Sequence, residues 1–107
     1  MRKLTLLMLV LLAVAAAARA EEPWVAVVAT DYVTGKLATL DSSAPWSPSC
    51  DLSSICSDAV ARYHDGLIYV VNRLGCDNIQ VIDPAANWTT LREFSVGGGS
   101  NPQGIAF

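Results

Sequence analysis

The chain carries an approximate internal repeat with a period of roughly 42–45 residues. One constant offset places 25–29 on 67–71 and also places 37–41 on 79–83. Both matched pairs join apolar runs of strand length, and the second of them ends in Asp on each side. A repeated pair of strands restricts the possible folds more than any other feature of this sequence, because each repeat must bury the same side chains in the same way.

A second match extends the repeat beyond one pair of strands. A slightly longer offset places 57–61 on 102–106, and extra residues in the loop around Cys50 account for the different spacing. Such a period, with about four strands per unit, is typical of a β-propeller blade. One such unit cannot bury both faces alone, so units stack and share their apolar faces.

The remaining pattern predicts an all-β protein of antiparallel strands. Apolar and β-branched runs alternate with turn signals such as Asp65-Gly66, Asp83-Pro84 and 97–99. The segment 46–57 is expected to be an irregular connection that replaces a regular fourth strand. The expected strands cover 24–30, 36–41, 58–63, 67–72, 78–83, 90–96 and 103–107.

Residues 1–20 have the three parts of a secretory signal peptide. Arg2 and Lys3 form a charged start, an apolar stretch follows, and 18–20 is a small-x-small cleavage site. Cleavage between Ala20 and Glu21 would leave residues 21–107 as a mature chain without a membrane span, in the periplasm or outside the cell.

The mature chain is acidic, with four basic and ten acidic residues. A net charge of −6 argues against nucleic acid as a partner, because such binders need a basic patch. The expected partners are an unknown protein or small-molecule ligand.

The second repeat resembles a blade of the YVTN-type bacterial β-propeller family. The resemblance rests on 69–73, on 81–84 and on the glycine–proline stretch that leads into 101–106. It covers 58–107 well and 24–41 faintly, and Val71 replaces the family's threonine. Since this motif marks blades and not an activity, the resemblance implies a secreted or surface propeller without assigning its function.

The chain is short for a closed propeller. Four units of about 42 residues need roughly 170 residues, whereas residues 21–107 provide about two units. We therefore expect an incomplete propeller, truncated at the C-terminus, from the N-terminal part of a longer protein. A small complete domain and a subunit that assembles blades from several chains are the alternatives. The strand predicted at 103–107 would favour self-association through an exposed edge.

Three cysteines in an exported chain predict a disulfide. Cys50 and Cys56 lie close together in a loop rich in Ser and Pro and are a possible pair. Cys76 is either unpaired or bonded to one of them. The spacing does not match a zinc site and His64 is the only histidine, so no metal or cofactor is predicted.

No catalytic motif stands out. We interpret His64 as a polar turn residue and not a general base, and Trp24, Trp46 and Trp88 as packing between blades. Asn87 starts a glycosylation sequon, whose use depends on the host. The acidic residues, expected at solvated turns and not in a calcium site, are Asp31, Asp41, Asp58, Asp65, Asp77 and Asp83.

The functional expectation is an exported propeller segment with a binding or surface-interaction role. The alternative is the N-terminal part of a lactonase-like or quinoprotein-like propeller enzyme, whose active-site residues lie in other blades.

Overall fold

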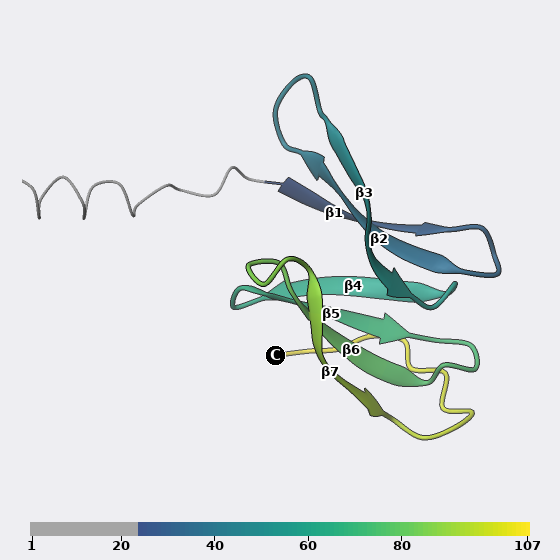
Figure 1. Cartoon of the computed structure of the whole chain (residues 1–107). Coiled ribbons are helices and arrows are strands. Elements are labelled where there is room, and N and C mark those ends of the chain that lie inside the picture. Colours follow the sequence, from purple (N-terminus) through teal and green to yellow (C-terminus); the bar gives the residue numbers. More distant parts are fainter. Residues whose placement is uncertain (1–23) are drawn as a thin grey trace, which may run out of the picture.

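A computed structural model of the chain describes residues 24–107, which form two antiparallel sheets and contain no helix (Figure 1). The predicted signal peptide at 1–20 and its cleavage site between Ala20 and Glu21 lie outside the described residues. The strands are β1 (Trp24–Thr30), β2 (Gly35–Asp41), β3 (Pro48–Ile55), β4 (Ala59–His64), β5 (Leu67–Asn72), β6 (Asn78–Asp83) and β7 (Thr89–Ser95).

Each sheet is a meander in which strands that follow one another in the chain are paired. Sheet 1 has the order β1-β2-β3, and sheet 2 has the order β4-β5-β6-β7. The tightest connection is Asp65-Gly66 between β4 and β5, where both residues have positive φ. This conformation matches the twist of two-residue hairpins and explains the Asp-Gly pair at that point.

The all-β prediction is confirmed, and six of the expected strands are present with ends shifted by at most one residue. The expectation of an irregular connection at 46–57 was wrong, because β3 occupies most of it and pairs with β2. β3 is rich in Ser, and its composition hides it from a propensity argument. Pairing with β2 supplies the backbone partners that its side chains do not indicate.

The strand expected at 103–107 is also wrong for the chain as described. Residues 101–107 run along sheet 2 without entering it (Figure 1). The Arg73 guanidinium donates to Gln103 Oε1 at 3.1 Å, and Leu74 N–H donates to Asn101 Oδ1 at 3.3 Å. At the other end, the Phe107 ring meets the Tyr69 ring with centroids 4.7 Å apart. Side-chain contacts therefore hold the segment in place of a strand ladder.

The two sheets share one hydrophobic core. Its buried members are Leu37 and Ile55 from sheet 1 and Ile68, Val70 and Ile82 from sheet 2. We call the face of sheet 1 that carries Leu37 its inner face, and the face of sheet 2 that carries Ile68 its near face. These faces pack together, and burial of their apolar surface is the main force that holds the sheets to each other.

Register shows how the repeat maps onto these faces. Val28 pairs with Leu37 in sheet 1, and Val71 pairs with Ile79 in sheet 2. β2 and β6 are therefore related by the expected offset, whereas the offset between β1 and β5 is one position longer. The connection at 31–34 is correspondingly shorter than the one at 73–77. The sequence match of β1 with β5 was out by one position, and one position moves a side chain to the other face.

With the corrected register, the inner face of sheet 1 is equivalent to the side of sheet 2 that points away from sheet 1. We call that side, with Val71, Ile79 and Val81, the far face of sheet 2. By the same register, the outer face of sheet 1, with Val25 and Val27, is equivalent to the near face of sheet 2. The sheets thus stack as two successive copies of one unit in the same orientation.

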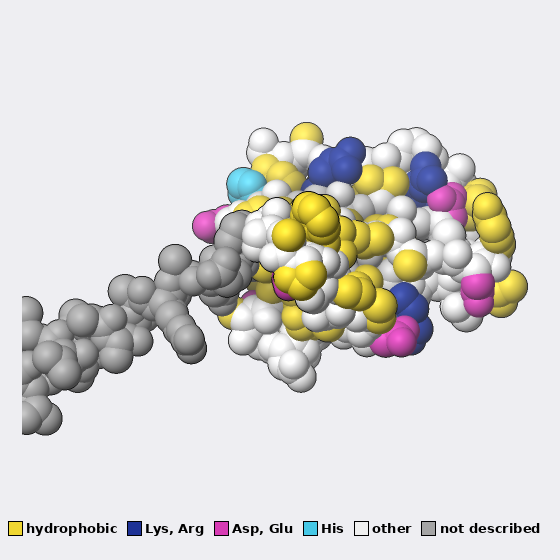
Figure 2. Space-filling model, turned by 90° about the horizontal axis from the view of Figure 1, so that it is seen from above, with side chains coloured by type: hydrophobic (Ala, Val, Ile, Leu, Met, Phe, Trp, Pro, Cys, Tyr) yellow, Lys and Arg dark blue, Asp and Glu magenta, His cyan; other side chains and the backbone are white. Residues whose placement is uncertain are grey.

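The outer face of sheet 1 is the least covered apolar surface of the strands. Val25 and Val27 are 51% and 39% exposed, whereas their equivalents in sheet 2, Ile68 and Val70, are buried. Hydrophobic side chains are grouped on the surface seen from above sheet 1 (Figure 2). Within residues 24–107, no helix has the length and apolar character to cross a membrane.

Candidate functional site

A cleft of about 560 Å³ lies at one end of the two sheets. Three chain segments form it, namely the β1–β2 connection, the passage from β3 to β4, and the β5–β6 connection. Two smaller hollows of about 350 and 290 Å³ flank the same β1–β2 connection. The residues that line the cleft are Val33, Thr34, Gly35, Lys36, Ser54, Ile55, Cys56, Ser57, Leu74, Gly75 and Cys76.

The β1–β2 connection is ordered by Asp31. Its Oδ1 accepts hydrogen bonds from the backbone N–H groups of Val33 and Thr34, at 2.8 and 2.5 Å. These bonds, with that from Thr34 the larger, lower the pKa of the Asp31 carboxyl below its ordinary value of 3.8, because they favour the charged form. Tyr32 adopts a positive φ of 70° at the tip and points into solvent.

One wall of the cleft carries a cation and a hydroxyl. Lys36 Nζ donates to Ser54 Oγ at 3.0 Å, across a directly paired position of β2 and β3. Gly35, next along β2, faces the carbonyl of Cys56 so closely that a Cβ would overlap it. Glycine is therefore required here by close packing of two chain segments.

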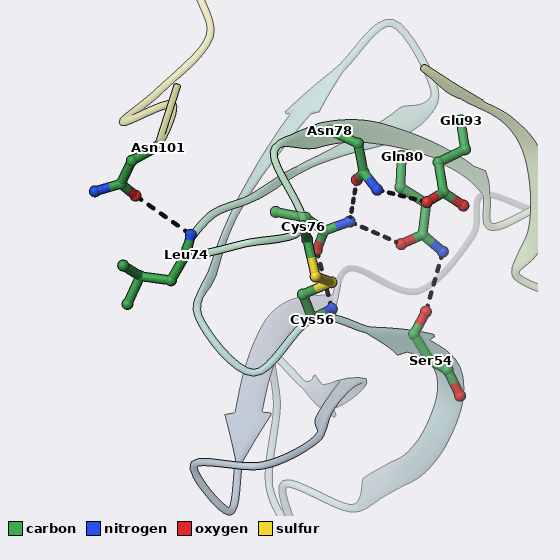
Figure 3. The surroundings of a disulfide bond; sticks show 9 residues. Ser54, Cys56, Leu74, Cys76, Asn78, Gln80, Glu93 and Asn101 are labelled. Carbon is green, nitrogen blue, oxygen red and sulfur yellow. Dashed lines mark hydrogen bonds between the residues drawn. A yellow bond between two sulfur atoms is a disulfide. The ribbon is translucent and has the colours of Figure 1, made fainter. Parts of the chain in front are cut away.

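A disulfide joins the other two segments. Cys56 is bonded to Cys76, with Cα atoms 6.6 Å apart (Figure 3). The bridge ties the passage between the sheets to the β5–β6 connection, so it fixes the distance between two walls of the cleft. Cys50 is free and exposed on β3.

A buried polar network supports the disulfide from behind (Figure 3). Asn72, which is 1% exposed, accepts from Cys56 N–H at 3.0 Å and donates to Asn78 Oδ1 and Gln80 Oε1. Gln80 in turn donates to the backbone carbonyl of Ser54 at 3.0 Å. The two amides of sheet 2 therefore hold the end of β3 by hydrogen bonds to its backbone.

An ion pair closes the base of the β5–β6 connection. Arg73 pairs with Asp58 through a short charge-assisted hydrogen bond, and its backbone N–H donates to the Asp58 carbonyl at 2.8 Å. The same guanidinium reaches Gln103, so this arginine joins β4, the connection and the C-terminal segment. Fixed connections of this kind make the cleft a preformed one.

The cysteine prediction is corrected by this geometry. The possible Cys50–Cys56 pair is not formed, and the alternative in which Cys76 bonds to Cys56 is present. Cys50 lies where β3 bulges away from regular pairing with β2, and β3 was not expected from the sequence. The strand separates the two cysteines that a flexible loop would have brought together.

The other candidate residues lie away from the cleft. His64 ends β4 just before the Asp65-Gly66 turn, at the opposite end of the sheets, and its ring stacks on Phe107 at 4.0 Å. Trp24 and Trp88 contact each other at 5.2 Å and pack against the core, as expected for packing between sheets. Trp46 is 59% exposed, so the same expectation was wrong for it.

Asp77 is a further correction, because it is buried and not solvated. Its carboxylate accepts from the N–H groups of Gly99 and Asn101 at 2.7 and 2.8 Å. It thereby orders the glycine-rich passage that follows β7. The other aspartates do not gather, and residues 24–107 hold no group of three His, Cys, Asp or Glu placed to bind a metal. Asn87 is exposed in the turn after β6.

The sequence argument missed Gly35, Lys36, Ser54, Leu74 and the amide network. A signal was present for the amides, since Asn72 and Gln80 stand at core positions of otherwise apolar strands. Comparison with family models, curated proteins and solved structures finds no match to this chain.

Proposed function

We propose that the chain is part of an exported β-propeller and that its cleft binds a small organic ligand. Two stacked sheets with equivalent faces, the internal repeat and the YVTN-like motif support a propeller. The signal-like residues 1–20 and the Cys56–Cys76 bridge support export to the periplasm or the cell exterior.

The observation that carries the binding role is the convergence of three connections around one fixed cleft. Connections placed by a rigid scaffold are where proteins carry binding groups. Here the Asp31 turn, the disulfide and the Asn72 network each restrain one of the three walls. A restrained site loses little conformational freedom when a ligand enters, which favours affinity.

The lining indicates the chemistry of the ligand. Lys36 provides the single charged group among the lining residues, Thr34, Ser54 and Ser57 provide hydroxyls, and Val33 and Leu74 provide apolar surface. A carboxylate beside an apolar group fits this set, since the ammonium would bind the anion and the aliphatic wall would cover the rest.

The Lys36–Ser54 contact is assigned to binding and not to nucleophilic catalysis. A lysine that activates a serine must lose its proton, which requires burial or a neighbouring cation. The hydrogen bond between these side chains is exposed to solvent. In the enzyme alternative, the catalytic residues would belong to other blades.

The test is an NMR titration of the exported protein with phenylacetate and, as the uncharged probe, phenylacetamide. We expect phenylacetate to shift amide signals at 33–36, 54–57 and 74–76, and phenylacetamide to bind at least tenfold more weakly. Lys36→Met keeps the aliphatic stem but removes the charge, so it should abolish the preference for phenylacetate.

Arg62→Met is the matched control, because Arg62 is a cation on β4 outside the cleft. It should bind phenylacetate as the parent protein does. Shifts scattered over the surface, or equal loss in both variants, would argue against a ligand site in the cleft. Ser54-dependent hydrolysis of a phenylacetate ester would instead favour the enzyme.

A further inference from the structure

The edge of β1 away from β2 has no paired strand among residues 24–107. In sheet 2 the equivalent edge, that of β5, is paired along its whole length with β4. Sheet 1 is therefore one strand short of sheet 2, at the edge where the two sheets approach each other. An unpaired edge presents a row of N–H and C=O groups that another strand can join.

The segment 103–107 has the properties of the strand that sheet 1 lacks. The longer of the two repeat offsets relates it to the beginning of β4, with Ile105 on Val60 and Ala106 on Ala61. Within the described part of the chain, the backbone groups of 104–107 make no backbone hydrogen bond. The segment is thus a β4-like sequence with its ladder groups free.

Its position repeats that of β4 as well. β4 lies beside β1, where the rings of Trp24 and Tyr63 meet edge to face at 6.0 Å. The C-terminal segment lies beside β5, where the rings of Tyr69 and Phe107 meet edge to face at 4.7 Å. β4 goes on to pair with the first strand of the following hairpin, which is β5. The C-terminal segment has no following hairpin within this chain as described.

The exposed apolar face of sheet 1 completes the argument. The outer face of sheet 1 is equivalent to the near face of sheet 2, which packs on the inner face of sheet 1. The far face of sheet 2 is equivalent to that inner face. Hence the outer face of sheet 1 in one molecule is shaped like the natural partner of the far face of sheet 2 in another.

We propose that copies of this chain associate head to tail. Residues 103–107 of one copy pair antiparallel with β1 of the next, and the outer face of that sheet 1 packs beside the far face of sheet 2. The contact uses two different surfaces, so it is heterologous and closes into a ring if the rotation permits. With two sheets per copy, a ring of four to eight sheets holds two to four copies. The proposal rests on the repeat and not on the ligand cleft.

Two variants block the two sides of the contact separately. The double substitution Ile105→Pro/Ala106→Pro, the tail-blocked variant, removes two successive N–H groups, of which one must point to the partner strand. Its control is Ile105→Val/Ala106→Ser, which keeps both. Val25→Asp, the face-blocked variant, puts a charge on the outer face of sheet 1. Its control is Leu91→Asp, on the remote edge strand β7, where the side chain is 52% exposed against 51% for Val25.

The experiment is light scattering after size exclusion, performed on the full chain secreted into an oxidising compartment. The parent chain and both controls should give one discrete mass of two to four copies. Each blocked variant should give the monomer mass with an unchanged far-UV circular dichroism spectrum. An equimolar mixture of the two blocked variants should give a 1:1 dimer, because each supplies the surface that the other lacks and the ring cannot close.

A monomeric parent chain would overturn the proposal, as would blocked variants that fail to form the dimer when mixed. Aggregates that ignore both variants would overturn it too. A monomer that still binds phenylacetate in the cleft would leave the proposed function intact while removing this inference.

Discussion

The two sheets are built on one plan but differ in how far the chain completes them. Sheet 2 has four strands, and side chains on both faces of β5 and β6 are buried. Sheet 1 has three strands, and β1 alternates between half-buried and exposed residues. The equivalent apolar positions therefore have different surroundings. A side chain's contribution to stability here depends on whether a neighbouring sheet covers it, more than on its own type.

The difference also divides the polar groups. At the end of β5, Asn72 is buried and bonded within a network, whereas Thr30 at the end of β1 is exposed. The disulfide lies at the boundary, joining the passage between the sheets to the β5–β6 connection. We expect sheet 2 to carry most of the stability and sheet 1 to depend on its contact with it.

The largest expected difference concerns Ile82 and Leu40, which are equivalent positions of β6 and β2. Ile82 is fully buried and Leu40 is half-buried on the outer face. Ile82→Ala should lower the free energy of unfolding by about 2–5 kcal/mol, whereas Leu40→Ala should lower it by about 1 kcal/mol or less. Urea unfolding in the tail-blocked background measures both without a contribution from association. Equal losses would contradict the division of burial between the sheets.

Removal of the disulfide comes next. The bridge joins Cys56 and Cys76 across a sequence separation of 20. The double substitution Cys56→Ser/Cys76→Ser should cost about 3 kcal/mol, mainly because the unfolded chain regains freedom. Cys50→Ser is the matched control and should leave the urea midpoint unchanged. A large effect of Cys50→Ser with none from the pair would show that the bonding is different.

The amide network should have a smaller effect. Asn72→Ala leaves the Cys56 N–H and the Gln80 Oε1 without this partner in a buried setting. We expect a loss of about 1–3 kcal/mol in the free energy of unfolding. Thr30→Ala, at the end of β1, should cost below about 0.5 kcal/mol because water replaces its hydrogen bonds. Comparable losses would mean that the two hairpin ends are equally buried.

The smallest effect is a pH dependence in the β1–β2 connection. Hydrogen bonds from Thr34 and Val33 lower the pKa of Asp31, so this carboxylate stabilises the turn above its ordinary pKa of 3.8. The contribution is lost as the pH falls through the lowered value. A carboxyl-detected NMR titration should find Asp31 titrating below 3.8. In Asp31→Asn the amide shifts of Val33 and Thr34 should no longer change in this range, and a midpoint above 3.8 would contradict the turn geometry.

Much of the fold was predictable because its strands are apolar, β-branched and bounded by turn residues. β5 and β6 show this most clearly, and both were located to the residue. β3 was not predictable, since Ser, Cys and Asp occupy it and only its pairing with β2 makes it a strand. The register of β1 was missed by one position because a gap of one residue in the connection leaves the apolar match almost unchanged.

The candidate site was less predictable than the fold. The cysteines were identified as a disulfide framework, but which two pair depends on a strand that spaces them. The cleft depends on three connections that are well separated in sequence and meet only through stacking of the sheets. Lys36 and Ser54 are ordinary polar residues in the sequence, and only cross-strand pairing brings them together.

The central claim is that the two sheets are successive copies of one unit, stacked inner face to near face. Methyl NOEs in the tail-blocked variant test this most directly, since they report only close side-chain contacts and are independent of assembly. The account predicts NOEs from the Leu37 methyls to the methyls of Ile68 or Ile82, and none from the Val27 methyls to either. NOEs from Val27 in place of Leu37 would show that the opposite face of sheet 1 packs on sheet 2, which would contradict the stacking and the repeat derived from it.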